Sequence, residues 1–186
     1  MNDIVMQQRV GLDASGGNER VKFFTSLGFI NQGSQFKSGG ERYDANDQSQ
    51  IFRFRANLDV QLFDNLSAYY RTAGNIRRDR LPVGFSVSQI YESLFSMPSS
   101  VYGPLTDDGE VIATQNFNNP TYGILNRSGY VKNTETTTVN QMGAKLDLGF
   151  ITKGLSIGGF AAYETQGLGE NKSSQTYERW LRTNDY

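Results

Sequence analysis

The sequence contains no cysteine and no histidine. This absence excludes disulfides, thiolate nucleophiles, imidazole acid–base catalysis, and zinc sites built from these two residue types. An excess of either charge is also lacking, because 18 basic and 19 acidic residues give a net charge of −1. Such a balance provides no overall attraction to nucleic acid or to an anionic membrane surface. We therefore expect no nucleic-acid partner.

Long hydrophobic runs are absent as well. The longest apolar stretch, 154–163, is far shorter than the ~18 residues that a membrane helix needs. No basic start followed by an apolar run is present near Met1, so no signal peptide is expected. The mean hydropathy is −0.51, but transmembrane β-strands are polar at alternate positions and also give low values. What the chain does have is 20 glycines, 12 phenylalanines and 10 tyrosines, a composition typical of strands.

Alternation is the clearest pattern in the chain. Residues 52–62 alternate strictly between apolar and polar, as expected for a strand with one apolar face. Five other segments follow the same rule less cleanly: 9–14, 21–29, 66–76, 141–150 and 155–164. Their apolar positions carry no charge at all, although 20% of all residues are charged. The opposite positions carry Arg53, Arg55, Asp59, Arg71, Lys145 and Asp147, among others.

The connections between these segments alternate in length. Short turns are expected at 16–19, 63–65 and 151–154, and long connections at about 31–50, 77–135 and after 166. This rhythm is typical of outer-membrane barrels, whose turns are short on one side and whose loops are long on the other. We predict one all-β domain over 1–186, an antiparallel transmembrane β-barrel segment of about six or seven strands. The segment 77–135 is predicted to be a long extracellular loop.

A soluble β-sheet binding or adhesin module is the alternative, because soluble antiparallel sheets alternate in the same way. The predicted strands are longer than the five or six residues usual in soluble sheets. A loop as long as 77–135 is also unusual in a compact soluble domain. Both points favour the barrel.

Several motifs carry a family resemblance. Residues 15–23 read S-G-G-N-E-R-V-K-F and resemble the S-G-G-N-E-K-x-K-Y turn and strand of SusC/RagA-type TonB-linked outer-membrane transporters. Residues 27–32 and 53–59 are similar to the next barrel strands of that family. Residues 107–109, 119–120 and 151–156 follow in the family's order, so the resemblance covers nearly the whole chain.

The resemblance implies a transporter of the bacterial outer membrane. Its barrel would have about 22 strands and an internal plug, and a TonB box would contact the TonB complex. A SusD-like lipoprotein would close over the external loops, and the cargo would be an oligosaccharide or a peptide. Since we find no TonB box, no plug and too few strands for closure, we expect a barrel segment that does not transport alone. Its partners would be outer-membrane lipid, the rest of the transporter chain, the SusD-like lipoprotein and the TonB complex.

The resemblance and the alternation together give two sets of strand residues to examine. Six charged residues at the polar alternate positions are predicted to face the lumen or the plug. The alternative is that they only form the hydrated face of a sheet. These candidates are Arg53, Arg55, Asp59, Arg71, Lys145 and Asp147. Aromatic residues near strand ends are predicted to form girdles at the two membrane interfaces: Phe23, Phe29, Phe52, Phe63, Tyr70, Phe150 and Tyr163.

The long connection contains one predicted helix. Ile90, Tyr91, Leu94 and Phe95 fit one stripe of a short helix that Ser88 caps and Pro98 ends. Such a helix would pack on the barrel rim or on a partner. The loop candidates for contact with cargo or a partner are aromatic, because aromatic rings stack on sugars: Tyr91, Phe95, Tyr102, Phe117, Tyr122 and Tyr130.

Carboxylates offer little catalytic chemistry. Residues 107–110 read D-D-G-E, which lacks the spaced ligands of a calcium loop and is a common turn sequence. Asp59 and Asp147 would have to come together to act as a glycosidase pair, and nothing in the sequence brings them together. We therefore expect no enzyme, no catalytic residue, no metal site and no cofactor.

Overall fold

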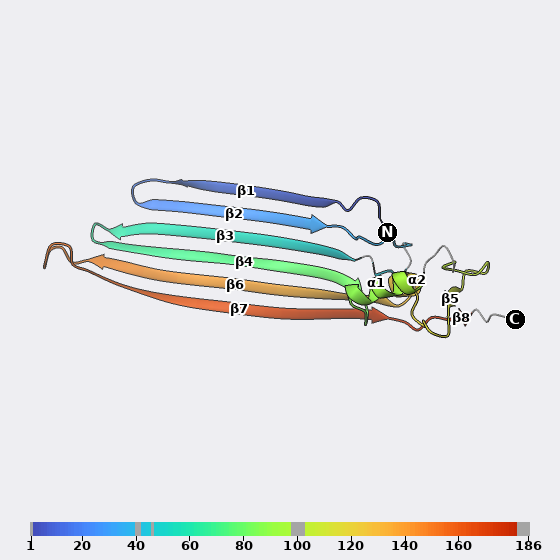
Figure 1. The fold of residues 1–186 in the computed structure, drawn as a ribbon. Coiled ribbons are helices and arrows are strands. Elements are labelled where there is room, and N and C mark those ends of the chain that lie inside the picture. Colours follow the sequence, from blue (N-terminus) through green and yellow to red (C-terminus); the bar gives the residue numbers. More distant parts are fainter. Residues whose placement is uncertain (1, 40–41, 46, 98–102, 182–186) are drawn as a thin grey trace.

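Six long strands form one antiparallel sheet in the computed structural model, which describes residues 2–39, 42–45, 47–97 and 103–181. They are β1 (Gln7–Gly17), β2 (Val21–Gln32), β3 (Gln48–Phe63), β4 (Leu66–Pro82), β6 (Gly129–Asp147) and β7 (Ser156–Ser174). The strands lie side by side in the order β1-β2-β3-β4-β6-β7 (Figure 1). Each overlaps one of the six alternating segments, although residues 148–150 and 155 of these segments lie outside the strands, and the all-β, antiparallel prediction is confirmed.

The strands extend farther than the sequence pattern predicts. β4 continues to Pro82 and β6 begins at Gly129, so the connection between them is 83–128, narrower than the predicted 77–135. The longest strands, β6 and β7, have 19 residues each and span about 60 Å. Strands in soluble proteins usually have about five or six residues. The sheet is therefore unusually tall for its width.

The three tight turns lie together at one end of the sheet (Figure 1). Between β1 and β2, the side-chain oxygen of Asn18 accepts hydrogen bonds from the backbone N–H groups of Arg20 and Val21 at 2.9 and 2.8 Å. Gly17 precedes this turn with a positive φ of 149°, and a Cβ there would collide with the Val21 carbonyl. The turn thus depends on the glycine and asparagine that the sequence pattern singles out.

The long connections meet at the other end, which we call the loop end. It contains α1 (Val87–Ser96), β5 (Val111–Ala113), α2 (Thr121–Asn126) and β8 (Arg179–Leu181), and β5 pairs with β8 in parallel. A small core of Phe36, Ile90, Ile124 and Leu125 joins both helices to the β2–β3 connection. The backbone N–H of Ala45 donates to the Leu125 carbonyl at 2.8 Å, which attaches that connection to α2.

The predicted loop helix is present as α1, but its cap differs from the prediction. Ser86, two residues before Ser88, is the N-cap, because Gln89 then stands at the third helical position and completes a capping box. Ile90 is buried, and Tyr91 and Leu94 pack against the core. Phe95 does not join this stripe, since it is 82% exposed. The second helix, α2, was not predicted; it is only six residues long and has no side-chain cap.

Apart from Pro82 at the loop end of β4, the buried apolar side chains lie outside the sheet. In the described residues they are Phe36, Ala45, Ile90, Met97, Val111, Ala113, Ile124 and Leu125. None of these belongs to the six long strands. The sheet therefore has no hydrophobic core of its own on either face.

The sheet is open in the described part of the chain. β1 pairs only with β2, and β7 only with β6, so each leaves one backbone edge unpaired. Every residue of β1 and nearly every residue of β7 is exposed. Long uncovered edges of this kind are ready to pair with another strand.

Glycines that lie opposite aromatic rings suggest a test of packing within the sheet. The Phe54 ring covers its cross-strand partner Gly74, and a Cβ on Gly74 would lie 2.7 Å from that ring and from the Thr137 carbonyl. We expect Gly74→Ala to lower the free energy of unfolding by about 1–3 kcal/mol, measured by urea titration of the β-sheet circular dichroism signal.

Gly159→Ala is the matched control for this measurement. Gly159 also lies inside a strand, and a Cβ there would meet no atom within 4 Å. This substitution should leave stability unchanged or raise it by about 0.5–1 kcal/mol. Equal losses in both variants would contradict the proposed role of the Phe54–Gly74 contact.

Candidate functional site

Residues that pair across two strands point to the same face of the sheet. By this rule, the uncharged alternate residues of all six predicted segments lie on one face. Phe29, for example, pairs with Phe52, which pairs with Ile76. We call this side the apolar face. Its members are Val10, Leu12, Ala14 and Gly16 of β1; Val21, Phe23, Thr25, Leu27 and Phe29 of β2; Phe52, Phe54, Ala56, Leu58 and Val60 of β3; Leu66, Ala68, Tyr70, Thr72, Gly74 and Ile76 of β4; Thr136, Thr138, Asn140, Met142, Ala144 and Leu146 of β6; and Ile157, Gly159, Ala161, Tyr163, Thr165 and Gly167 of β7.

One amide lies in the middle of the apolar face. The Asn140 side-chain oxygen accepts hydrogen bonds from the Tyr70 hydroxyl at 2.8 Å and the Thr72 hydroxyl at 2.9 Å. All three residues are on this face. Neighbouring side chains therefore satisfy the amide oxygen without help from water, as an apolar environment would require.

The six charged candidates lie together on the opposite side, which we call the polar face. Arg53, Arg55 and Asp59 come from β3, Arg71 from β4, and Lys145 and Asp147 from β6, and all six are exposed. Among the described residues none of them forms an ion pair. The guanidinium of Arg71 lies 4.6 Å from the Tyr69 ring centre instead. Their charges remain available to other groups.

Two hollows on the polar face bring four of these six residues together. Arg53 and Arg55 line a hollow of about 540 Å³ that also borders Arg9 and Asp13. Arg55 is shared with a second hollow of about 350 Å³, which Asp59 and Arg71 line as well. Lys145 and Asp147 line neither hollow, because they lie nearer the tight turns on β6.

The carboxylates that the sequence analysis considered for catalysis or metal binding are dispersed. Asp59 and Asp147 lie two strands apart and are offset along the sheet, at a separation of roughly 16 Å. The 107–110 segment forms a tight turn in which the Gly109 N–H donates to the Thr106 carbonyl at 3.0 Å. In the described ranges no three acidic side chains gather in a way that would hold a metal ion.

The loop aromatics divide into anchors and exposed rings. Tyr91 is an anchor, because its hydroxyl donates to Gln35 Oε1 at 2.8 Å and its ring packs on Phe36. Tyr122 and Tyr130 are half-buried, whereas Phe95 and Phe117 are exposed. Tyr102 lies outside the described residues. Of the six predicted contact residues, Phe95 is therefore the most accessible apolar side chain among those described.

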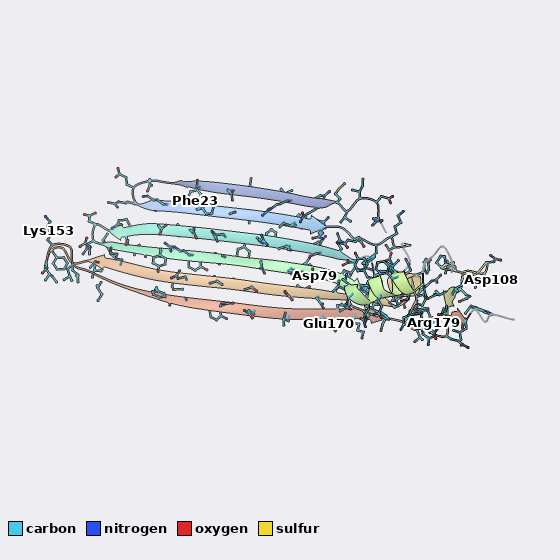
Figure 2. The ribbon with its side chains drawn as sticks, in the orientation of Figure 1. Phe23, Asp79, Asp108, Lys153, Glu170 and Arg179 are labelled. Carbon is cyan, nitrogen blue, oxygen red and sulfur yellow. The ribbon has the colours of Figure 1, made fainter. Side chains whose placement is uncertain are left out.

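The predicted girdle residues lie on the apolar face or in a turn. Phe29 and Phe52 pair near the loop end, and Phe63 pairs with Leu66 at the tight turns. Phe23 and Tyr70 flank Leu58, and Phe23 is seen on β2 near its turn in Figure 2. Tyr163 is level with the middle of the face, and Phe150 lies in the turn before β7.

Acidic groups approach one another near the loop end. Asp79, visible there in Figure 2, accepts a hydrogen bond from the Ser49 hydroxyl at 2.6 Å and forms an ion pair with Arg77 at 2.7 Å. Burial, and secondly the nearby Asp79 carboxylate, raise the pKa of Asp47 above its ordinary value of 3.8. Asp47 therefore carries its negative charge at an unfavourable position in the folded protein.

Sequence reasoning missed one group of charged residues. Arg78 and Arg80 of β4 and Lys132 of β6 lie on the same side as the apolar face, beyond Ile76 toward the loop end. They were assigned to the predicted loop 77–135. The signal was present in the sequence, since Arg78 and Arg80 continue the spacing of two that begins at Leu66.

A comparison with protein-family models and with curated proteins found no match for the chain. Neither helix in the described residues is long and apolar enough to cross a membrane.

Asp47 provides a test of the electrostatics at the loop end. Because folding favours the protonated carboxyl, the free energy of unfolding should fall as the pH rises from 3.8 through the raised pKa. We expect Asp47→Asn to remove this loss. The variant should be more stable than the original protein at neutral pH, and the difference should disappear below the ordinary pKa.

Urea titrations at several pH values measure this effect. Asp108→Asn is the control, because it removes an exposed turn carboxylate far from Asp79, as Figure 2 shows. The same pH dependence in both variants would count against the assignment to Asp47.

Proposed function

We propose that the chain forms part of the wall of a transmembrane β-barrel, within a SusC/RagA-type TonB-linked transporter of the bacterial outer membrane. One observation carries this proposal: over the apolar face as defined above, six paired strands present only uncharged side chains. A surface in contact with lipid tails has this requirement, whereas the opposite face of a barrel wall is polar.

The size of the apolar face supports lipid contact. About ten residues along each strand and six strands across give an area on the order of 1,000 Å². The largest apolar patch on a soluble monomer is usually about 300–600 Å². Side chains on this face are well exposed, for example Met142 at 58% and Ile157 at 60%. In the described residues no second sheet packs against them, as a soluble sandwich would require.

The height of this face also fits a bilayer. From Leu66 to Ile76, β4 spans ten residue steps, or about 34 Å along the strand. At the usual strand tilt of about 40° this corresponds to about 26 Å, close to the ~25 Å apolar band of outer-membrane barrels. The strands continue beyond the band toward the loop end, as strands that lead into external loops do.

The two open edges support membership of a larger sheet. Six strands are too few for a closed barrel, which needs about eight or more. Unpaired N–H and C=O groups along β1 and β7 would be costly within a bilayer. Further strands of the transporter would pair with both edges, and the polar face with its unpaired Arg53 and Arg55 would then line the lumen and contact the plug.

The transport function rests on the family resemblance of the turn, strand and loop motifs. In this proposal the complete transporter imports oligosaccharides or peptides, with energy from the TonB complex, and the loop end contacts a SusD-like lipoprotein. Exposed Phe95 on α1 is the residue we assign to that contact. Apolar side chains of this kind are common anchors at protein interfaces.

A charge placed on each face of one strand tests the lipid-facing assignment. Leu58 and Asn57 are adjacent in β3 and point to opposite faces. In the full-length protein that contains this chain, we expect Leu58→Arg to destabilise the barrel by about 2–4 kcal/mol. Asn57→Arg, the matched control, should have little effect. Urea unfolding from phospholipid vesicles measures the difference.

Two results would contradict the proposal. One is an equal effect of the two arginines. The other is a monomeric protein that melts cooperatively in detergent-free buffer, which would favour the soluble binding or adhesin module instead.

The partner contact has its own test. Because Phe95 is 82% exposed and is not among the residues that pack against the small core, Phe95→Ser should leave the fold intact and weaken binding of the SusD-like lipoprotein about tenfold or more. Val87→Ser on the same helix is the control. Binding is measured by titration of the purified lipoprotein, and unchanged affinity for the Phe95 variant would argue against this contact.

A further inference from the structure

Three cations occupy a distinct position on the sheet. Arg78, Arg80 and Lys132 are the charged residues of the six strands that lie on the same side as the apolar face; the other strand charges lie on the polar face. All three are positive and adjacent, since Arg80 pairs directly with Lys132 and Arg78 is the next residue of β4 on this side. We call them the cationic patch.

The patch begins where the apolar face ends. Successive residues on one side of a strand are about 6.7 Å apart, so Arg78 lies about 7 Å beyond Ile76, and Arg80 about 13 Å beyond it. With the usual strand tilt these distances become heights of about 5 and 10 Å. The headgroup region extends about 5–8 Å beyond the hydrocarbon core on each side, so Arg78 lies within it and Arg80 and Lys132 lie at its outer margin.

The geometry points to a phosphate-bearing lipid headgroup as the ligand of this patch, an inference that rests on the proposed contact between the apolar face and lipid. The patch borders a hollow of about 610 Å³ that is also lined by the neutral side chains of Gln48, Gln50 and Thr134. Asp79 and Glu170 border it too, but both belong to the polar face, and Asp79 is already paired with Arg77. Clustered guanidinium and ammonium groups bind phosphate oxygens well.

The three cations differ in their contacts within the protein. Arg80 lies 4.0 Å from the Tyr130 ring centre and donates to the backbone carbonyl of Asp44 at 2.6 Å, so it also supports the loop end. Lys132 lies 5.1 Å from the same ring, on its own strand, and is exposed. Arg78 is exposed as well. Changing Arg78 and Lys132 therefore removes only one contact within the protein, that of Lys132 with the Tyr130 ring, and leaves the hydrogen bond of Arg80 in place.

The acyl chains of such a lipid would follow the apolar face below the patch. Ile76, Phe52 and Phe29 form the last apolar row before the cations, so one molecule would contact both surfaces. A free phosphate ion would use the cations alone. Contact with the apolar face therefore distinguishes a lipid headgroup from a free phosphate ion.

The test uses the full-length protein that contains this chain, purified in a neutral detergent. Phosphatidic acid is titrated as the probe and bound lipid is counted by native mass spectrometry. Phosphatidylcholine serves as the lipid without net charge, and inorganic phosphate as a competitor. We expect the double variant Arg78→Gln, Lys132→Gln to bind phosphatidic acid about 30-fold more weakly, since each cation near an anionic headgroup contributes about a factor of five.

The control is the double variant Arg9→Gln, Lys172→Gln. Both residues are exposed and lie near the loop end, but on the polar face, and the total change in charge is the same. It should bind phosphatidic acid as the original protein does. High salt should weaken binding to the original protein and have less effect on the Arg78, Lys132 variant.

Three outcomes would overturn the inference. The first two are an equal loss of phosphatidic acid affinity in the two double variants and an equal affinity for phosphatidic acid and phosphatidylcholine. The third is full displacement of phosphatidic acid by an equal concentration of inorganic phosphate, which would indicate an ion site. Normal bilayer insertion together with any of these would leave the barrel proposal intact. Failure of the original protein to insert into neutral bilayers would instead count against the barrel proposal.

Discussion

The register of the backbone hydrogen bonds, which shifts only between Gln61 and Phe63 of β3, is the constraint on which the rest of this molecule depends. Side chains alternate between faces along each strand, so a slip of one residue in any pair would exchange the faces of every residue beyond it. Such a slip in β3 would move Arg53, Arg55 and Asp59 to the apolar face. The separation of charged from uncharged residues is therefore a property of the pairing, and neither face exists in one strand alone.

Both ends of the sheet help to hold this register. At the tight turns, Gly17 and Asn18 adopt local geometries that set where β2 begins relative to β1. At the loop end, the small core around Ile90 and Ile124 attaches the β2–β3 and β4–β6 connections to each other. Between these ends, the Phe54 ring lies over Gly74, its partner in β4, which has no side chain in its way. A shift of the pairing would place a residue with a side chain beneath this ring. The faces thus follow from local turn chemistry, distant packing and cross-strand fit together.

Much of the sheet could be predicted from the sequence, because alternation and turn residues are local signals. These signals predict the six strands and the short turns that join them as antiparallel neighbours. They also predict that Arg53, Arg55, Asp59 and Arg71 lie on one face. The upper part of β4 could not be predicted in this way, because charges at 77–80 occupy both parities. The first half of β6 is rich in threonine and lacks an apolar parity, so its strand state depends on its pairing with β4. Lys132 and Arg80 become neighbours only through that pairing.

The parallel pair of β5 and β8 has a consequence for the order of assembly. β1 with β2, β3 with β4, and β6 with β7 are hairpins whose partners are close in sequence, and such contacts form quickly. β5 must wait for Arg179–Leu181, which follow β7 at the far end of the chain. We expect the hairpins to form before this pair is completed during folding. A chain truncated after Ser174 would have all three hairpins but would leave the Val111–Ala113 edge unoccupied.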